Sequence, residues 1–242
     1  MQEYRACPNP YTPPLSCNSH IRLPAILPLS RRLAASATAT AIRLFARAIT
    51  AVQATWAGCA PEPVQRVYFA NHTSNGDFVL IWTVLPERMR QKTRPVAASD
   101  YWLTSRLKAF IGQDVFNAVL IDRRPEARTA DPVAQMIAAL DDGASLILFP
   151  EGQRNTTETA LLPFKTGLFH LARQRPGTEL VPVWVANLNR VMPKGEVIPI
   201  PLVCTVTFGT PLRIADGEGK DDFLARAEAA LLTTAPNERG AA

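Results

Sequence analysis

Beyond residue 60 the chain alternates between short apolar runs and longer stretches in which apolar residues recur at every third or fourth position. The short runs predict strands at 66–70, 95–98, 116–121, 145–149, 180–185 and 203–208. Helical spacing falls between them at 77–85, 101–110, 132–140 and 164–173, and again at 222–232. Strands that alternate with helices form parallel sheets, because each parallel connection needs a crossover. We therefore predict an α/β domain over 61–242, with a largely parallel central sheet flanked by helices.

The first 60 residues follow a different pattern. Residues 1–32 are rich in proline, which interrupts helices, and predict a flexible tail. Residues 33–60 predict an amphipathic helix, in which Ile42, Phe45 and Ile49 share one face. No uncharged stretch there reaches the roughly 20 residues that span a bilayer. The apolar face either lies in a membrane interface or packs on its own domain, and we favour a membrane-associating helix.

The charge and cysteine content limit the classes of binding partner and metal site that the protein can have. The net charge is +5 and the pI about 9.3, which suits an anionic surface. The sequence has no nucleic-acid motif, so we expect an anionic membrane and no nucleic acid. The four cysteines, Cys7, Cys17, Cys59 and Cys204, form no C-x-x-C pair and have no metal-ligand spacing. We expect reduced thiols, no metal site and a cytoplasmic location.

Polar side chains follow three of the predicted strands. Asn71 to Asp77 follow the first, Asp122 and the arginines at 123 and 124 follow the third, and residues 150–154 follow the fourth. In α/β sheets ligands bind beyond the carboxyl ends of the strands. A histidine, acids and cations are therefore expected at one edge, a composition suited to acid–base chemistry on an anionic substrate.

His72 and Asp77 allow two interpretations. Ser74 can cap a helix, and Asp77, three positions later, can accept a hydrogen bond from the backbone N–H of the cap. Alternatively, Asp77 accepts a hydrogen bond from one imidazole nitrogen of His72 and leaves the other nitrogen as a general base. Spacing alone leaves both interpretations open.

Five short blocks occur in order between residues 66 and 185. They are Asn71-His72-Thr73-Ser74 with Asp77, Ile121-Asp122-Arg123, Phe149-Pro150-Glu151-Gly152-Gln153-Arg154-Asn155, Phe164-Lys165-Thr166-Gly167 followed by Leu171-Ala172, and Val181-Pro182-Val183. Together they resemble the signatures of the glycerolipid acyltransferase family, the 1-acylglycerol-3-phosphate acyltransferases with their H-x4-D and F-P-E-G-T-R-S motifs. A chance match to one block is easy, but five in order are specific. Gln153 and Asn155 stand where that family has Thr and Ser.

The resemblance implies roles for individual residues. His72 is the catalytic base and Asp77 its partner, while Arg123 and Arg154 bind the phosphate of the acceptor. Three further expectations rest on the chemistry of the residues themselves. Lys165 is a further cation for that phosphate. Glu151 orients Arg154 or contacts a substrate hydroxyl. Gly152 lets the backbone approach the substrate closely or serves the turn.

The predicted function follows from these roles. We expect transfer of a fatty acyl group from acyl-CoA or acyl-carrier protein, as co-substrate and without a bound cofactor, to lysophosphatidic acid, giving phosphatidic acid in phospholipid synthesis. The alternatives are another lysolipid acceptor, such as a lyso-ornithine lipid or a lysophospholipid with a headgroup, and a non-catalytic lipid-binding protein. The expected location is peripheral, at the cytoplasmic face of the cell membrane.

Overall fold

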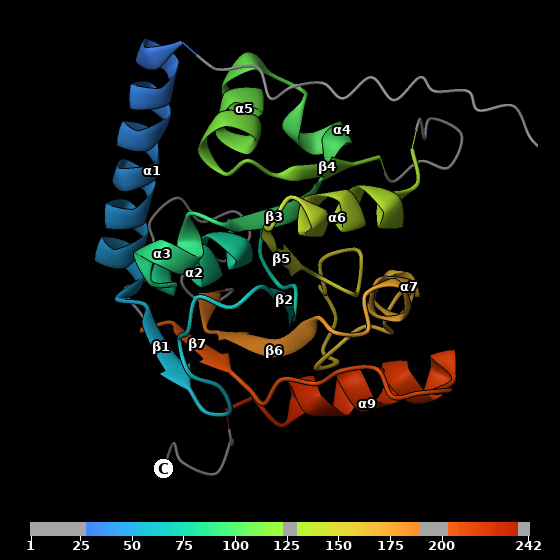
Figure 1. The fold of residues 1–242 in the computed structure, drawn as a ribbon. Coiled ribbons are helices and arrows are strands. Elements are labelled where there is room, and N and C mark those ends of the chain that lie inside the picture. The colour runs from blue at the N-terminus through green and yellow to red at the C-terminus, as the bar shows by residue number, and fades with distance from the viewer. Residues whose placement is uncertain (1–27, 123–129, 189–202, 237–242) are drawn as a thin grey trace, which may run out of the picture.

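A computed structural model describes residues 28–122, 130–188 and 203–236. Within these residues seven strands form one sheet in the order β1-β7-β6-β2-β5-β3-β4 (Figure 1). The strands are β1 Gln53–Trp56, β2 Arg66–Ala70, β3 Thr93–Ala98, β4 Val119–Ile121, β5 Ser145–Leu148, β6 Glu179–Ala186 and β7 Thr205–Phe208. The five strands from β6 to β4 are parallel to one another, whereas β7 is antiparallel to β6 and parallel to β1. The predicted α/β fold with a largely parallel sheet is confirmed.

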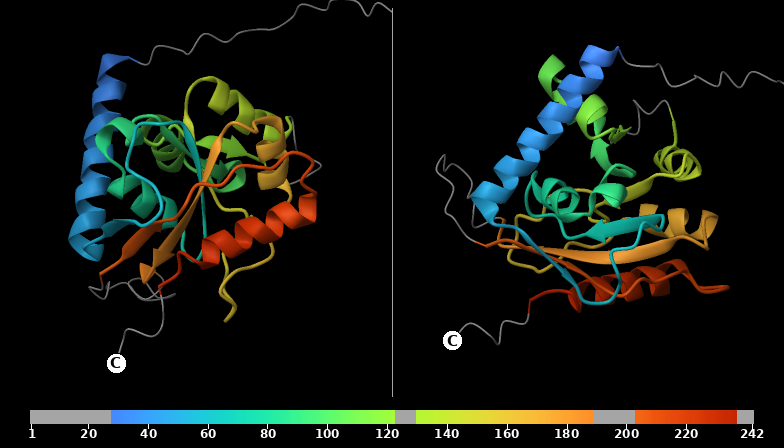
Figure 2. Two further views of the ribbon diagram at one scale, coloured as in Figure 1. Left: turned by 60° about the horizontal axis from the view of Figure 1, so that its bottom comes forward. Right: turned by 60° about the vertical axis from the view of Figure 1, so that its left-hand side comes forward.

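Helices cover both faces of the sheet, because the side chains of each central strand alternate between two cores. In β2, Tyr68 and Ala70 belong to one core, and Val67 and Phe69 to the other. The first core is covered by α1 Leu29–Thr50, α2 Asp77–Val84 and α3 Glu87–Arg90. The second is covered by α6 Pro132–Asp141, α7 Gly167–Gln174 and α9 Lys220–Leu232 (Figure 2).

The predicted helix at 101–110 is split in two. Its parts are α4 Ser99–Trp102 and α5 Arg106–Phe110, and a π-helical turn, Ile111–Val115, follows before β4. The break falls at Ser105, whose backbone is extended and whose hydroxyl caps α5 by accepting the N–H of Lys108. A serine in the middle of a helical pattern therefore starts a new helix here.

The prediction of one helix over 33–60 is wrong at both ends. Helix α1 begins at Leu29, inside the predicted tail, and ends at Thr50, because Ala51 adopts a left-handed conformation with φ 42°. Residues 53–56 form β1, an edge strand that pairs with β7, and the Trp56 ring stacks on Phe208. The sheet domain therefore begins before residue 61. Residues 1–27 of the predicted tail lie outside the described residues.

Helix α1 has two apolar faces instead of one. Ile42 and Ile49 pack on the core, so the interpretation of a helix packed on its own domain holds for them. Phe45, predicted on the same face, is not covered by the domain and stays 67% exposed. The outward face carries four large apolar side chains that are 59–70% exposed: Leu29, Leu33, Leu44 and Phe45. Among the described residues no helix is both long enough and apolar enough to cross a bilayer.

Candidate active site

His72 and Asp77 meet where β2 gives way to α2. Strand β2 ends at Ala70, α2 begins at Asp77, and the intervening turn returns the chain so that Nδ1 of His72 lies 3.0 Å from Oδ2 of Asp77. The same oxygen accepts the backbone N–H groups of Thr73 at 2.7 Å and Ser74 at 2.8 Å. Helix α2 begins at Asp77 with Gly76 at its N-cap position, so Ser74 is not the helix cap that the first interpretation predicts. The bond from the Ser74 N–H and the contact with His72 nevertheless exist together, on one carboxylate oxygen.

This geometry fixes the imidazole. A carboxylate only accepts hydrogen bonds, so Nδ1 of His72 carries the proton and Nε2 keeps its lone pair. The ring stacks on Phe149, with centroids 4.2 Å apart and an interplanar angle of 18°. Asp77 is fully buried, whereas the side chain of His72 is 18% exposed. The pair can therefore take a proton at Nε2 and stabilise the resulting imidazolium.

Asn71 anchors the segment just before His72. Its side-chain amide donates to the carbonyl oxygen of Val185 at 3.0 Å, and its side-chain oxygen accepts the N–H of Val185 at 2.8 Å. The Asn71 side chain thereby continues the ladder between β2 and β6 by one step after β2 has ended. Its place in a motif does not reveal this role, because Val185 is distant in sequence.

Glu151 holds the backbone of His72. One of its carboxylate oxygens accepts the N–H of His72 at 2.8 Å and the other accepts the N–H of Leu162 at 2.9 Å. The side chain is only 1% exposed, and this burial raises the pKa of the Glu151 carboxyl, while the two N–H bonds oppose the rise. Glu151 thus positions the backbone of His72, and a contact of Glu151 with a substrate hydroxyl or with Arg154 stays a prediction.

Asn155 holds the backbone carbonyl of His72. Its backbone N–H donates to the carbonyl oxygen of His72 at 2.6 Å. Its buried side chain donates to the carbonyl of Thr159 and accepts from the N–H and hydroxyl of Thr157, which closes the loop. The segment after β5 thus grips His72 at both its N–H and its carbonyl. An asparagine suits position 155 because its side-chain amide both donates and accepts in these bonds.

Gly152 and Lys165 form a second contact within this segment. Gly152 has φ +70°, and a Cβ there would lie 3.1 Å from Cε and 3.2 Å from Cγ of Lys165. The N–H of Lys165 donates to the carbonyl of Pro150 at 2.7 Å. Gly152 therefore serves the turn and lets the Lys165 chain lie across it. Arg154 is exposed, on the stretch between Glu151 and Asn155.

The comparisons with known proteins agree with this architecture. The sequence profile of the Acyltransferase family matches residues 60–186, which is more than half of the chain. The protein belongs to the Acyltransferase family. The matched stretch of this acyltransferase contains His72, Asp77 and the segment around Glu151.

Several relatives carry one name. Two 1-acyl-sn-glycerol-3-phosphate acyltransferases match this acyltransferase, the Haemophilus influenzae protein at 30% identity over 137 residues and the Escherichia coli protein at 31% over 138. The matches cover 51% and 52% of this chain and 51% of each relative. The chain thus spans about half the length of these curated relatives. A protein named Taffazin from Dictyostelium discoideum is 32% identical over 148 residues, covering 57% of this chain and 50% of that protein.

One solved structure has the same fold. It is the 1-acyl-sn-glycerophosphate (LPA) acyltransferase PlsC from Thermotoga maritima, with a TM-score of 0.63 and 18% sequence identity. The likeness covers 86% of this chain and 83% of that one. At this identity it establishes the fold alone.

The structure describes most, but not all, of the predicted site. His72, Asp77, Glu151, Gly152 and Lys165 are tied together by the contacts above, and Arg154 lies in the same loop with its side chain exposed. Arg123 lies outside the described residues. Among the described residues no group of three or more histidine, cysteine or acidic side chains could hold a metal ion.

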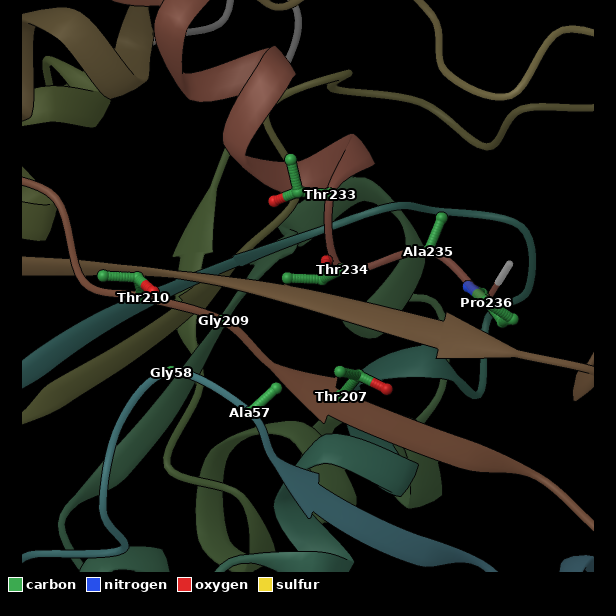
Figure 3. Close-up of a pocket in the computed structure, with 9 residues that line it drawn as sticks. All are labelled: Ala57, Gly58, Thr207, Gly209, Thr210, Thr233, Thr234, Ala235 and Pro236. Carbon is green, nitrogen blue, oxygen red and sulfur yellow. The ribbon is translucent and has the colours of Figure 1, made fainter.

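A cavity of about 320 Å³ lies away from these residues, where Gly58, Thr207 and Gly209 face the end of α9 (Figure 3). The remaining residues that line it are Ala57, Thr210, Thr233, Thr234, Ala235 and Pro236. None of these side chains is an acid, a base or a histidine. The lining of this cavity therefore offers no side chain suited to acid–base chemistry.

Proposed function

We propose that this acyltransferase moves a fatty acyl group from acyl-CoA or acyl-carrier protein to the free hydroxyl of lysophosphatidic acid, giving phosphatidic acid. The observation that carries the proposal is the 3.0 Å contact between His72 Nδ1 and the buried Asp77, which directs Nε2 as a base. Family membership and the names of the relatives support the class of reaction.

In the proposed reaction the acceptor hydroxyl gives its proton to Nε2 of His72 while its oxygen attacks the thioester carbonyl. Asp77 stabilises the imidazolium that forms. The tetrahedral intermediate collapses by breaking the C–S bond, and the thiolate then takes the proton back from His72. Thiols have a pKa near ~8.5, so the thiolate leaves without strong acid assistance. One base therefore suffices, and neither a bound cofactor nor an acyl-enzyme is required.

The phosphate of the acceptor needs cations. We propose Arg154 and Arg123, together with Lys165, for this role, because a guanidinium matches phosphate oxygens with two donors. Arg154 is exposed and lies between Glu151 and Asn155, both of which hold His72. A cation on this loop can reach a substrate whose hydroxyl lies at Nε2.

We also propose that the outward face of α1 rests on the cytoplasmic surface of an anionic membrane, with the protein peripheral. Four large apolar side chains are exposed on this single helix, which is unusual for a surface that faces only water. Arg32 and Arg47 are exposed on the same helix and suit anionic headgroups. Such contact would bring the site close to its lipid substrates.

The test is to incubate the full chain with acyl-CoA and, separately, with lysophosphatidic acid, lyso-ornithine lipid, a lysophospholipid with a headgroup and monoacylglycerol. The products are identified by mass. We expect phosphatidic acid to form fastest. If another lysolipid were acylated faster, that lysolipid would be the acceptor, and the proposed acyl-transfer reaction would stand. Absence of every acylated product, with acyl-carrier protein also tried as donor, would indicate a lipid-binding protein instead.

A further inference from the structure

A second cavity, of about 280 Å³, lies under α1 at the opposite edge of the sheet from His72. It is bordered by α1, by α2 and α3, by the start of β3 and by the residues that precede β4. Strands β2, β5 and β3 are parallel, and His72 follows the carboxyl end of β2, whereas Arg94 stands at the beginning of β3. The cavity is therefore separate from the proposed acceptor site.

Three arginines from three different elements line this cavity: Arg43 of α1, Arg90 of α3 and Arg94 of β3. Glu87 is the one acid among the described lining residues, so the formal charge of the lining is positive. Within the described parts of the chain, none of the three arginines forms an ion pair with an acid oxygen. Three like charges with a single acid among them repel one another, and a bound anion would lower this cost in free energy.

The guanidinium groups are held in place by neutral partners. Nη1 of Arg90 donates to the carbonyl of Leu85 at 2.9 Å, and its guanidinium lies 5.3 Å from the ring centre of Trp82. Nε of Arg94 donates to the carbonyl of Asn117 at 2.7 Å. Each of these contacts leaves further N–H donors of the same guanidinium unused by protein carboxylates. Arg90 and Arg94 are thus positioned before any ligand arrives.

The pKa shifts of Arg90 and Arg94 also favour a bound anion. Burial, followed by the charges of Arg43 and Arg47, lowers the pKa of Arg90, while Glu87 opposes the change. Burial also lowers the pKa of Arg94, opposed by Asp142. A bound anion would relieve both effects by supplying the missing negative charge.

We infer that this cavity is a binding site for a phosphoryl group, held by Arg43, Arg90 and Arg94. Arginine forks pair with phosphate oxygens through two parallel hydrogen bonds, and the polar side chains of Thr40 and Gln91 line the same space. The volume is near the lower end of the roughly 300–1,000 Å³ typical of small-molecule sites, so it suits a headgroup and not a whole lipid. The site goes beyond the proposed function, which uses the other edge of the sheet.

The experiment measures binding of inorganic phosphate to the full chain by calorimetry, at one ionic strength maintained with chloride. We expect saturable binding that Arg43→Gln weakens by about tenfold or more, because a hydrogen-bonded charge contact contributes roughly 1.5–3 kcal/mol. Arg88→Gln is the matched control, since Arg88 is exposed on the same helix as Arg90 and does not line the cavity. Arg94→Lys, which keeps the charge and removes the fork, provides a second variant that disturbs the fold less.

Arg154→Ala separates this site from the acceptor site. Equal binding by wild type, Arg43→Gln and Arg94→Lys, or a loss in Arg154→Ala alone, would overturn the inference. Flotation with phosphatidylcholine vesicles, with and without phosphatidic acid, then identifies the source of the phosphoryl group. Recruitment that depends on both phosphatidic acid and Arg43 indicates a lipid headgroup. Phosphate binding without such recruitment indicates a soluble phosphate compound, and both results support the site.

Discussion

The edge of the sheet around His72 and the outward face of α1 hold their side chains in opposite ways. Around His72, buried groups with two or three hydrogen bonds each fix one backbone conformation. On α1, Leu29, Leu33, Leu44 and Phe45 are 59–70% exposed. Substitutions around His72 should therefore alter the rate of the reaction. Substitutions on the outward face of α1 should alter only where in the cell the reaction takes place.

The largest effect is expected from His72→Ala. Removal of a general base costs about 10²–10⁴-fold in rate, while the hydrogen bonds of the backbone at position 72 can remain. Initial thiol release measures the loss, and circular dichroism checks the fold. His170→Ala is the matched control, because His170 lies partly buried in α7 and contacts only Phe169 among the described rings. A folded His72→Ala protein with near-normal turnover would contradict the role of His72.

Arg154→Ala sharpens the comparison, because Arg154 is exposed like the outward face of α1 but belongs to the loop around His72. We expect kcat/KM for lysophosphatidic acid to fall by about 10–100-fold, as for loss of a charge-assisted hydrogen bond. The value for monoacylglycerol, which has no phosphate, should change far less. Arg175→Ala is the control, since this half-exposed arginine follows α7, precedes β6 at the other edge of the sheet and pairs with Asp141 at the end of α6. Equal losses of kcat/KM on both acceptors would show that Arg154 does not bind the phosphate of the acceptor.

Glu151→Gln tests whether the His72 backbone must be held. Both oxygens of Glu151 accept N–H groups, and an amide can accept at only one of its two ends. The unsatisfied N–H costs about 1–3 kcal/mol. We expect kcat to fall by about tenfold with little change in KM, since the variant displaces the base without touching the acceptor. Glu158→Gln, in the same loop but exposed, should leave both constants unchanged. A variant that raised KM alone would instead place Glu151 at the substrate.

The face of α1 is tested by the double variant Leu44→Ser and Phe45→Ser. Removing two apolar side chains from a membrane interface costs about 1.5–3 kcal/mol each if they are fully buried there. We expect the partition coefficient onto phosphatidylglycerol vesicles to fall at least tenfold, with kcat on detergent-dispersed substrate unchanged. Leu232→Ser changes an exposed leucine on α9 and should have no effect. Unchanged vesicle binding in the double variant would place the membrane contact elsewhere.

The smallest effect concerns pH. Burial raises the pKa of the Glu151 carboxyl, so the folded chain holds this proton more tightly than the unfolded chain does. The stability that this proton contributes is present below the unfolded pKa and is lost as pH rises through the folded pKa. The free energy of unfolding of wild type, relative to Glu151→Gln, should therefore fall as pH rises from about 4 to 7. Urea unfolding at several pH values measures it, and a difference that grows with pH would oppose the assignment.

Much of the fold could be predicted because its central strands are continuous apolar runs. The boundaries of β2 match the prediction, and all six predicted strands exist. Strand β1 could not be found, because its four residues continue a helical pattern and are extended only through pairing with β7, which lies far along the chain. The two faces of α1 could not be separated for a similar reason. Periodicity groups Ile42 with Phe45, but only tertiary packing decides that Ile42 is covered and Phe45 is not.

In the candidate site, too, contacts between residues close in sequence could be predicted, and contacts between distant residues could not. The spacing of His72 and Asp77 is local, so a short sequence motif is enough to indicate their contact. The role of Glu151 depends on His72, which is 79 residues away in sequence, and on Leu162, 11 residues further along the loop after β5. An acid that follows a strand resembles a substrate ligand in a sequence. Its burial is a property of the fold.

The most direct test of the central claim follows thioester cleavage and acceptor acylation in one sample. Wild type and His72→Ala are each incubated with acyl-CoA and lysophosphatidic acid, and free thiol and phosphatidic acid are quantified together. We predict one phosphatidic acid for each thiol in wild type, no thiol release without acceptor, and loss of both products in folded His72→Ala. Thiol release that continues without acceptor, or phosphatidic acid made by folded His72→Ala at the wild-type rate, would contradict the role of His72 as the base for direct transfer.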